Sequence, residues 1–162
     1  GIDLHHATDA VFHKLPVVTA LMRELDEHLA LGQCARGPRR AVAHIGVELL
    51  LDGVLIDEPA YRAAYLSGLT HEPALAWRDP EDAPHFAIVL DRLRAHGVPE
   101  DLRLPEAITK RLHRILAHRP LLAPSSEDLR AIHQALVAFK PRLDVAVDTV
   151  MRGMRAALGD PH

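Results

Sequence analysis

The sequence has little cysteine, few aromatic residues and no long apolar run. Cys34 is its single cysteine, so no internal disulfide can form, which is typical of proteins from a reducing compartment. The longest apolar stretches, such as the one around Glu48, are far too short to span a bilayer, and no signal peptide is recognisable. We therefore expect a cytoplasmic protein without a membrane partner. Cys34 is interpreted as an ordinary loop cysteine, with a thiol nucleophile as the alternative.

The chain also lacks a strong charge of either sign. Its formal net charge of −3 at pH 7 gives no support for a nucleic-acid partner, which usually meets a strongly basic face. With 48% hydrophobic and 25% charged residues, the composition is typical of a globular protein rather than a disordered one. We predict one domain over residues 1–162, with an N-terminal piece missing if the protein starts before Gly1.

What the sequence does contain is helix formers, above all Ala, Leu, Arg and Glu, and it shows no alternating β-branched run. Prolines and glycines divide it into segments for about seven or eight helices in an all-α domain. The expected helices lie roughly at 2–13, 16–31, 39–56, 60–69, 85–97, 105–118 and from 126 onward. Residues 34–40 are predicted as a loop, and 70–84 as a loop over the site. Pro141 predicts a kink or a boundary between two helices.

Histidine is unusually frequent, and two segments repeat metal-ligand residue types every four residues. These are His5, Asp9 and His13 in the first segment, and His44, Glu48 and Asp52 in the second. Residues four apart stack on one helix face about 6 Å apart, close enough to share an ion, so His5 with Asp9 and Glu48 with Asp52 are the expected ligand pairs. Each set of three, called a ladder below, spans about 12 Å, which is too long for all three residues to bind one ion. Either two ions bind, or the outer residue of each ladder supports the ligands without binding the ion itself. Mixed imidazole and carboxylate ligands favour Mn or Mg, with Fe or Zn as alternatives.

Glu48 and Asp52 lie inside the most apolar of the expected helices. Burying two unpaired carboxylates would cost several kcal/mol each, so they need a cation, a proton or an exposed groove. Gly46 costs about 1 kcal/mol in a helix interior and indicates close approach of another helix or a ligand. The alternative is that both carboxylates lie on a narrow solvent-exposed stripe. For His13, the alternative is an ordinary solvated histidine at a helix end.

Taken in order, these segments resemble the acyl carrier protein phosphodiesterase family, a divergent relative of the HD-type metal-dependent phosphohydrolases. The first segment matches a family motif at Gly1, Ile2, His5, Asp9, Leu15 and Pro16. The second matches at Asp52 and Leu55, with Glu48 in place of an aspartate. The sequence departs from these motifs at three positions: Asp3 replaces a histidine, His13 an aspartate and Gly53 a histidine.

The resemblance implies an HD-like helical fold and hydrolysis of the phosphodiester that joins 4′-phosphopantetheine to holo acyl carrier protein. A divalent ion held by His5, Asp9 and Asp52, with Glu48 as ligand or base, would activate a water for this reaction. Candidate phosphate-binding residues are Arg36, Arg39 and Arg40, and His44 and His13 are further candidate ligands. An acidic carrier protein would find a basic docking face in Lys110, Arg111 and Arg114.

Three other functions fit the same sequence. One is a helical metal- or ligand-binding protein that kept the scaffold without the reaction, and another is a hydrolase for a different phosphodiester. The third is a helical bundle that acts through protein contacts, in which both ladders would be accidental. Bound divalent metal separates the third from the others, because the third does not need the ladders to bind an ion.

Overall fold

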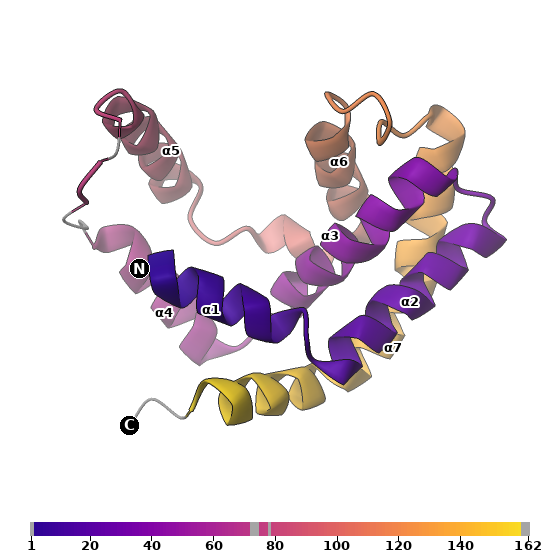
Figure 1. Ribbon diagram of the computed structural model, residues 1–162, viewed down its shortest axis with the longest axis horizontal. Helices are drawn as coiled ribbons and strands as arrows, with labels where there is room; N and C mark the ends of the chain where they lie inside the picture. Colours follow the sequence, from indigo (N-terminus) through magenta and orange to yellow (C-terminus); the bar gives the residue numbers. More distant parts are fainter. Residues whose placement is uncertain (1, 72–74, 78, 160–162) are drawn as a thin grey trace. The chain divides into compact units, whose positions relative to one another are not determined.

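The computed structural model describes residues 2–71, 75–77 and 79–159, and all regular structure in these residues is helical. The predicted all-α class is therefore confirmed for this part of the chain. The helices are α1 Ile2–Phe12, α2 Pro16–Leu31, α3 Arg36–Leu55, α4 Pro59–Thr70, α5 Asp82–His96, the 3-10 helix η1 Glu100–Arg103, α6 Pro105–Leu116 and α7 Ser126–Leu158 (Figure 1). Over these ranges, no helix combines the length and the apolarity that a bilayer crossing requires.

The chain divides into two compact units. Unit 1 comprises Gly1–Val54 and Asp101–His162, and unit 2 comprises Leu55–Glu100. The ladders predicted from the sequence both belong to unit 1. That residues 1–162 form a single HD-like domain stays a prediction.

The core of unit 1 lies where α7 packs against α2, α6 and α1. Helices α2, α6 and α7 contribute leucines or isoleucines at helical spacing, which places them on one face. The fully buried side chains include Leu21, Leu25 and Leu29 of α2, Leu112 and Leu116 of α6, and Ile132, Leu136 and Phe139 of α7. This shared apolar interior fixes the helices on which the candidate site is built.

Helix α3 begins at Arg36, so the predicted loop over 34–40 is wrong for most of its length. Pro38 is compatible with this early start because the amide groups of a first turn have no partner within the helix. Gly46 faces Leu25 of α2 and Leu136 of α7, where a Cβ atom would lie 3.3 and 3.5 Å from their methyl groups. The close approach predicted at Gly46 is thus made by neighbouring helices.

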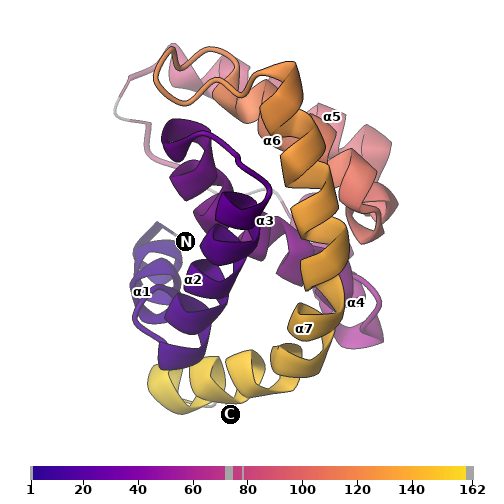
Figure 2. The same cartoon turned by 90° about the vertical axis from the view of Figure 1, so that its right-hand side faces the viewer.

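Helix α7 begins with a capping box and continues through Pro141. Ser125 accepts a hydrogen bond from the Asp128 amide, and the Asp128 carboxylate accepts one from the Ser125 amide. Pro141 lies inside the helix, so the alternative of two separate helices is wrong. The helix changes direction partway along (Figure 2), as expected where a proline removes one hydrogen bond and crowds the preceding turn.

Unit 2 contains α4 and α5, and neither helix has a buried residue. The Arg94 side chain donates to the Leu69 carbonyl at 2.7 Å, which joins the two helices. In the predicted irregular segment 70–84, residues 75–77 have no regular structure, 72–74 and 78 lie outside the described residues, and α5 begins at Asp82. Whether this segment covers the site stays a prediction.

Candidate metal centre

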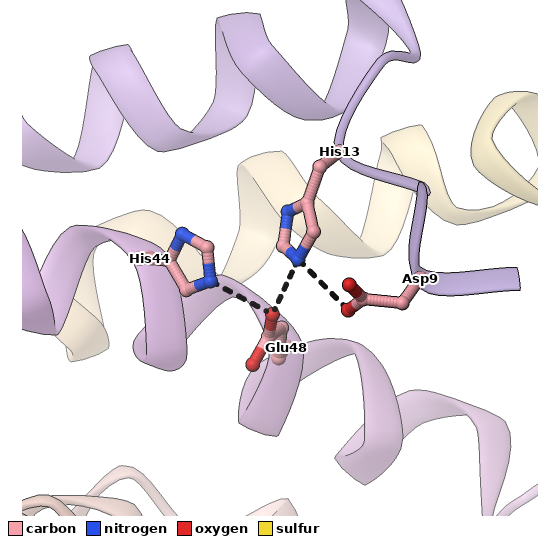
Figure 3. A network of polar contacts seen from close by, with 4 residues as sticks. All are labelled: Asp9, His13, His44 and Glu48. Atoms are coloured by element: carbon pink, nitrogen blue, oxygen red, sulfur yellow. Dashed lines mark hydrogen bonds and ion pairs between the residues drawn. The ribbon is translucent and has the colours of Figure 1, made fainter. Parts of the chain in front are cut away.

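Four residues from the two ladders meet in unit 1: Asp9 and His13 from the first, and His44 and Glu48 from the second (Figure 3). We call them the histidine–carboxylate cluster. His13 directly follows α1, and its amide donates to the Asp9 carbonyl at 3.1 Å, so the helical turn continues and both side chains share one face. His44 and Glu48 are one turn apart on α3. Local helix geometry therefore supplies two pairs, which the packing of unit 1 brings together.

Both imidazoles direct Nε2 at the same carboxylate oxygen. His13 Nε2 lies 3.4 Å from Glu48 Oε1, and His44 Nε2 lies 3.3 Å from it. His13 Nε2 also lies 3.1 Å from Asp9 Oδ1. The two rings stack with centroids 4.4 Å apart and planes 24° apart. Two nitrogens, one from the turn that follows α1 and one from α3, thus converge on one oxygen (Figure 3).

This spacing fits a divalent ion. One ligand atom each from His13, His44 and Glu48 can be chosen so that all lie within 4.8 Å of one another. Ligands about 2.0–2.2 Å from a common ion are themselves separated by roughly 3–4 Å. The His44 side chain is 49% exposed and that of Glu48 35%, so coordination positions would remain open to water or substrate. A purely structural role would leave the same atoms as imidazole–carboxylate hydrogen bonds.

Asp52 lies one turn beyond Glu48 on α3 and remains partly open to solvent. Desolvation by the surrounding protein raises the pKa of its carboxyl group, and the negative charge of Glu48 raises it further. A nearby cation would oppose both effects. Asp52 thus lies on the same helix as His44 and Glu48, and its recorded interaction with the cluster is the charge interaction with Glu48.

The remaining predicted ligand, His5, belongs to α1 one turn before Asp9, but its side chain lies outside the described residues. Its role stays a prediction. Within the described side chains, every member of the cluster had been singled out from the sequence. What the sequence did not indicate is which members of the two ladders would meet.

The three candidate phosphate-binding arginines differ in their surroundings. Arg39 is half-buried and its Nε lies 3.0 Å from Asp26 Oδ1 of α2, so its charge is already used within the fold. Arg36 and Arg40 are exposed. The Asp26 contact joins two helices, so no pattern within a single segment predicts it.

The predicted docking residues on α6 also differ in whether an acidic side chain pairs with them. Lys110 pairs with Glu106 one turn earlier at 2.7 Å, and Arg111 pairs with Asp101 at 2.6 Å. Arg114 is exposed. Two of the three positive charges are thus balanced within unit 1, which weakens the basic face expected for an acidic partner.

Cys34 is buried and remains protonated at neutral pH. Burial and the neighbouring charge of Asp128 raise the pKa of its thiol to about 12. A nucleophilic cysteine needs a thiolate, which this environment disfavours. The interpretation as an ordinary cysteine agrees with this setting better than the nucleophile does.

Comparison of the chain with known protein families, with curated proteins and with solved structures finds no match in any of the three. The site therefore has to be judged on its own geometry.

Proposed function

We propose that this protein is a divalent-metal-dependent phosphodiester hydrolase, with the ion held by His13, His44 and Glu48 and assisted by Asp9. The observation that carries the proposal is the convergence on Glu48 Oε1 of two Nε2 atoms, one from the turn that follows α1 and one from α3. Manganese or magnesium is the favoured ion, because carboxylate oxygens form half of this ligand set. Iron and zinc are the alternatives.

The chain's own residues divide the remaining work. A bound ion would supply Lewis acidity that acidifies a water and offsets charge on a phosphoryl oxygen. His13, His44 and Glu48 position that ion. We assign Asp52 as the proton acceptor, because it is an exposed carboxylate one turn from Glu48 on the same helix.

For the substrate, we propose the phosphodiester between 4′-phosphopantetheine and holo acyl carrier protein. The resemblance of the segments around Asp9 and Asp52 to the acyl carrier protein phosphodiesterase family supports this choice. Arg114 offers an exposed positive charge for an acidic carrier protein. A cytoplasmic location would follow from such a substrate.

One observation favours a second candidate, a metal-binding protein that does not catalyse the reaction. Gly53 replaces a motif histidine, and a Cβ atom there would overlap the carbonyl group of Leu102. No side chain fits at position 53 without movement of that backbone. A histidine at position 53 would therefore not fit this fold, so the site differs from the family motif in more than one exchanged ligand.

The test is to incubate the chain with holo acyl carrier protein and Mn²⁺ and to weigh the carrier protein by mass spectrometry. We expect loss of the phosphopantetheine mass with wild type and its retention with Asp52→Ala. Asp148→Ala, which changes an exposed aspartate of α7, serves as the control and should behave as wild type. A parallel assay with bis(p-nitrophenyl) phosphate detects hydrolysis of other phosphodiesters.

The outcomes separate the candidates. Cleavage of the small diester alone would replace the carrier protein by another substrate. Tight Mn²⁺ binding without any hydrolysis would establish the non-catalytic candidate. Failure to bind Mn²⁺, Mg²⁺, Fe²⁺ or Zn²⁺ would end both.

A further inference from the structure

Arg40 lies one turn before His44 on α3, in line with the cluster. In an α-helix, residues four apart stack on one face with about 6 Å between them, and each step turns the side chain by only about 40°. Arg40, His44 and Glu48 therefore follow one another along α3. Arg40 is exposed, so its guanidinium group is accessible to a ligand.

The neighbouring arginines are less suited to bind such a ligand. Arg39 contacts Asp26 at 3.0 Å, whereas no hydrogen bond or ion pair joins Arg40 to any residue in the described ranges. Arg36 lies a further turn away, about 12 Å from the level of His44 along the helix axis. Of the two arginines without such a contact, Arg36 and Arg40, the latter is thus the nearer in register to the cluster.

The charge of the cluster also requires a positive partner for an anion. Glu48 and Asp9 together carry two negative charges when ionised. One divalent ion would neutralise them and leave no net positive charge to attract an anion. A phosphate group that binds the ion would bring further negative charge and would gain from a guanidinium beside it. Arginine matches phosphate oxygens with two parallel N–H groups, a geometry that lysine lacks.

We propose that Arg40 binds a phosphoryl oxygen of a phosphate ligand that is coordinated at the same time by the ion of the histidine–carboxylate cluster. This inference rests on the proposed function, because it needs the ion. It assigns the ligand class as phosphate esters and gives Arg40 the role of a binding residue rather than a metal ligand.

The experiment is a pair of calorimetric titrations on the whole chain. Mn²⁺ is first titrated in phosphate-free buffer, and inorganic phosphate is then titrated into the Mn²⁺-loaded protein. For Arg40→Ala we expect Mn²⁺ affinity equal to or slightly tighter than wild type, because a positive charge has gone. Phosphate affinity should fall at least tenfold, and Arg40→Lys should restore part of it.

Arg130→Ala is the matched control, because Arg130 is an exposed arginine on α7 outside the proposed site. It should change neither titration. Equal phosphate affinity in wild type and Arg40→Ala would overturn the inference, as would a Mn²⁺-loaded wild type that binds no phosphate. Both results would leave Mn²⁺ binding intact, whereas failure of the first titration would remove the proposed function itself. Far-UV circular dichroism checks that each variant is folded.

Discussion

Two carboxylates of unit 1, Asp128 and Glu48, each lie in a polar cluster, and their surroundings differ in kind. Asp128 is 8% exposed and accepts hydrogen bonds from the amides of Ala35 at 2.7 Å and Ser125 at 2.9 Å, and from the Ser125 hydroxyl at 2.8 Å. Glu48 is more exposed, and the contacts described for it come from two imidazoles. One carboxylate is bound by donors of the backbone, and the other by groups that can themselves bind a metal.

This difference separates a structural site from a candidate functional one. Backbone amides are permanent donors, so Asp128 is satisfied as long as the fold persists. An imidazole nitrogen either donates a proton or offers a lone pair, depending on its protonation. The Glu48 contacts can therefore be exchanged for bonds to a cation, whereas those of Asp128 cannot. Four predictions test this comparison.

The largest effect is expected for Asp128→Ala. It removes the cap of α7 and leaves the Ala35 amide without its acceptor, so we expect the free energy of unfolding to fall by about 2–4 kcal/mol in urea titrations. Mn²⁺ affinity should not change. Glu127→Ala, an exposed neighbour in the same turn, is the control with a small effect. A loss below about 0.5 kcal/mol for Asp128→Ala would contradict the structural role.

Glu48→Gln should show the opposite pattern. Loss of the shared carboxylate should weaken Mn²⁺ binding on the order of 100-fold, measured by calorimetry. The free energy of unfolding should stay within about 0.5 kcal/mol of wild type, because Glu48 is only half-buried and its loss relieves repulsion on Asp52. Glu27→Gln, on the exposed face of α2, should change neither quantity. Unaltered Mn²⁺ affinity in Glu48→Gln would place the ion elsewhere.

The loss of stability at acid pH should depend in part on protonation of Asp128. Burial alone would raise the pKa of this carboxyl group, but the hydrogen bonds from Ala35 and Ser125 outweigh burial and lower it. The folded state therefore binds fewer protons than the unfolded state, so this contribution to stability is complete above the unfolded pKa of about 4. It is lost as the pH falls through the lower pKa of the folded state.

The measurement is the melting temperature of wild type and Asp128→Asn as the pH is lowered from about 6 to about 2.5. The gap between them should be constant near neutral pH and should close in acid. A gap that stays constant across the whole range would show that ionisation of Asp128 does not stabilise the fold.

The smallest effect concerns Cys34. Its pKa of about 12 in the folded protein exceeds the ordinary value of 9.0, so stability should decline as the pH rises above 9.0, when only the unfolded state loses the proton. Alkylation by iodoacetamide at pH 8 should be slow in the native protein. Asp128→Ala should accelerate it, because one cause of the raised pKa is removed. Rapid alkylation of native wild type would contradict the buried, protonated thiol.

Much of the fold could be predicted from the sequence because its signals are local. The apolar spacing of α2, the prolines that open α4 and α6, and the capping box at Ser125 each act within a few residues. The start of α3 was misplaced because the glycine and arginines of 34–40 look like a loop. Tertiary contact favours the helix there, since Gly37 packs against the backbone of Leu121.

The sequence by itself determined the helical class and the pairing of Asp9 with His13 and of His44 with Glu48, because residues four apart meet on any α-helix. Only the tertiary structure decided that these two pairs face each other, that Arg39 is committed to Asp26 while Arg40 is not, and that Asp128 caps an amide 93 residues away. Such contacts depend on how apolar helix faces pack together, and that packing is a property of the whole core rather than of any short segment.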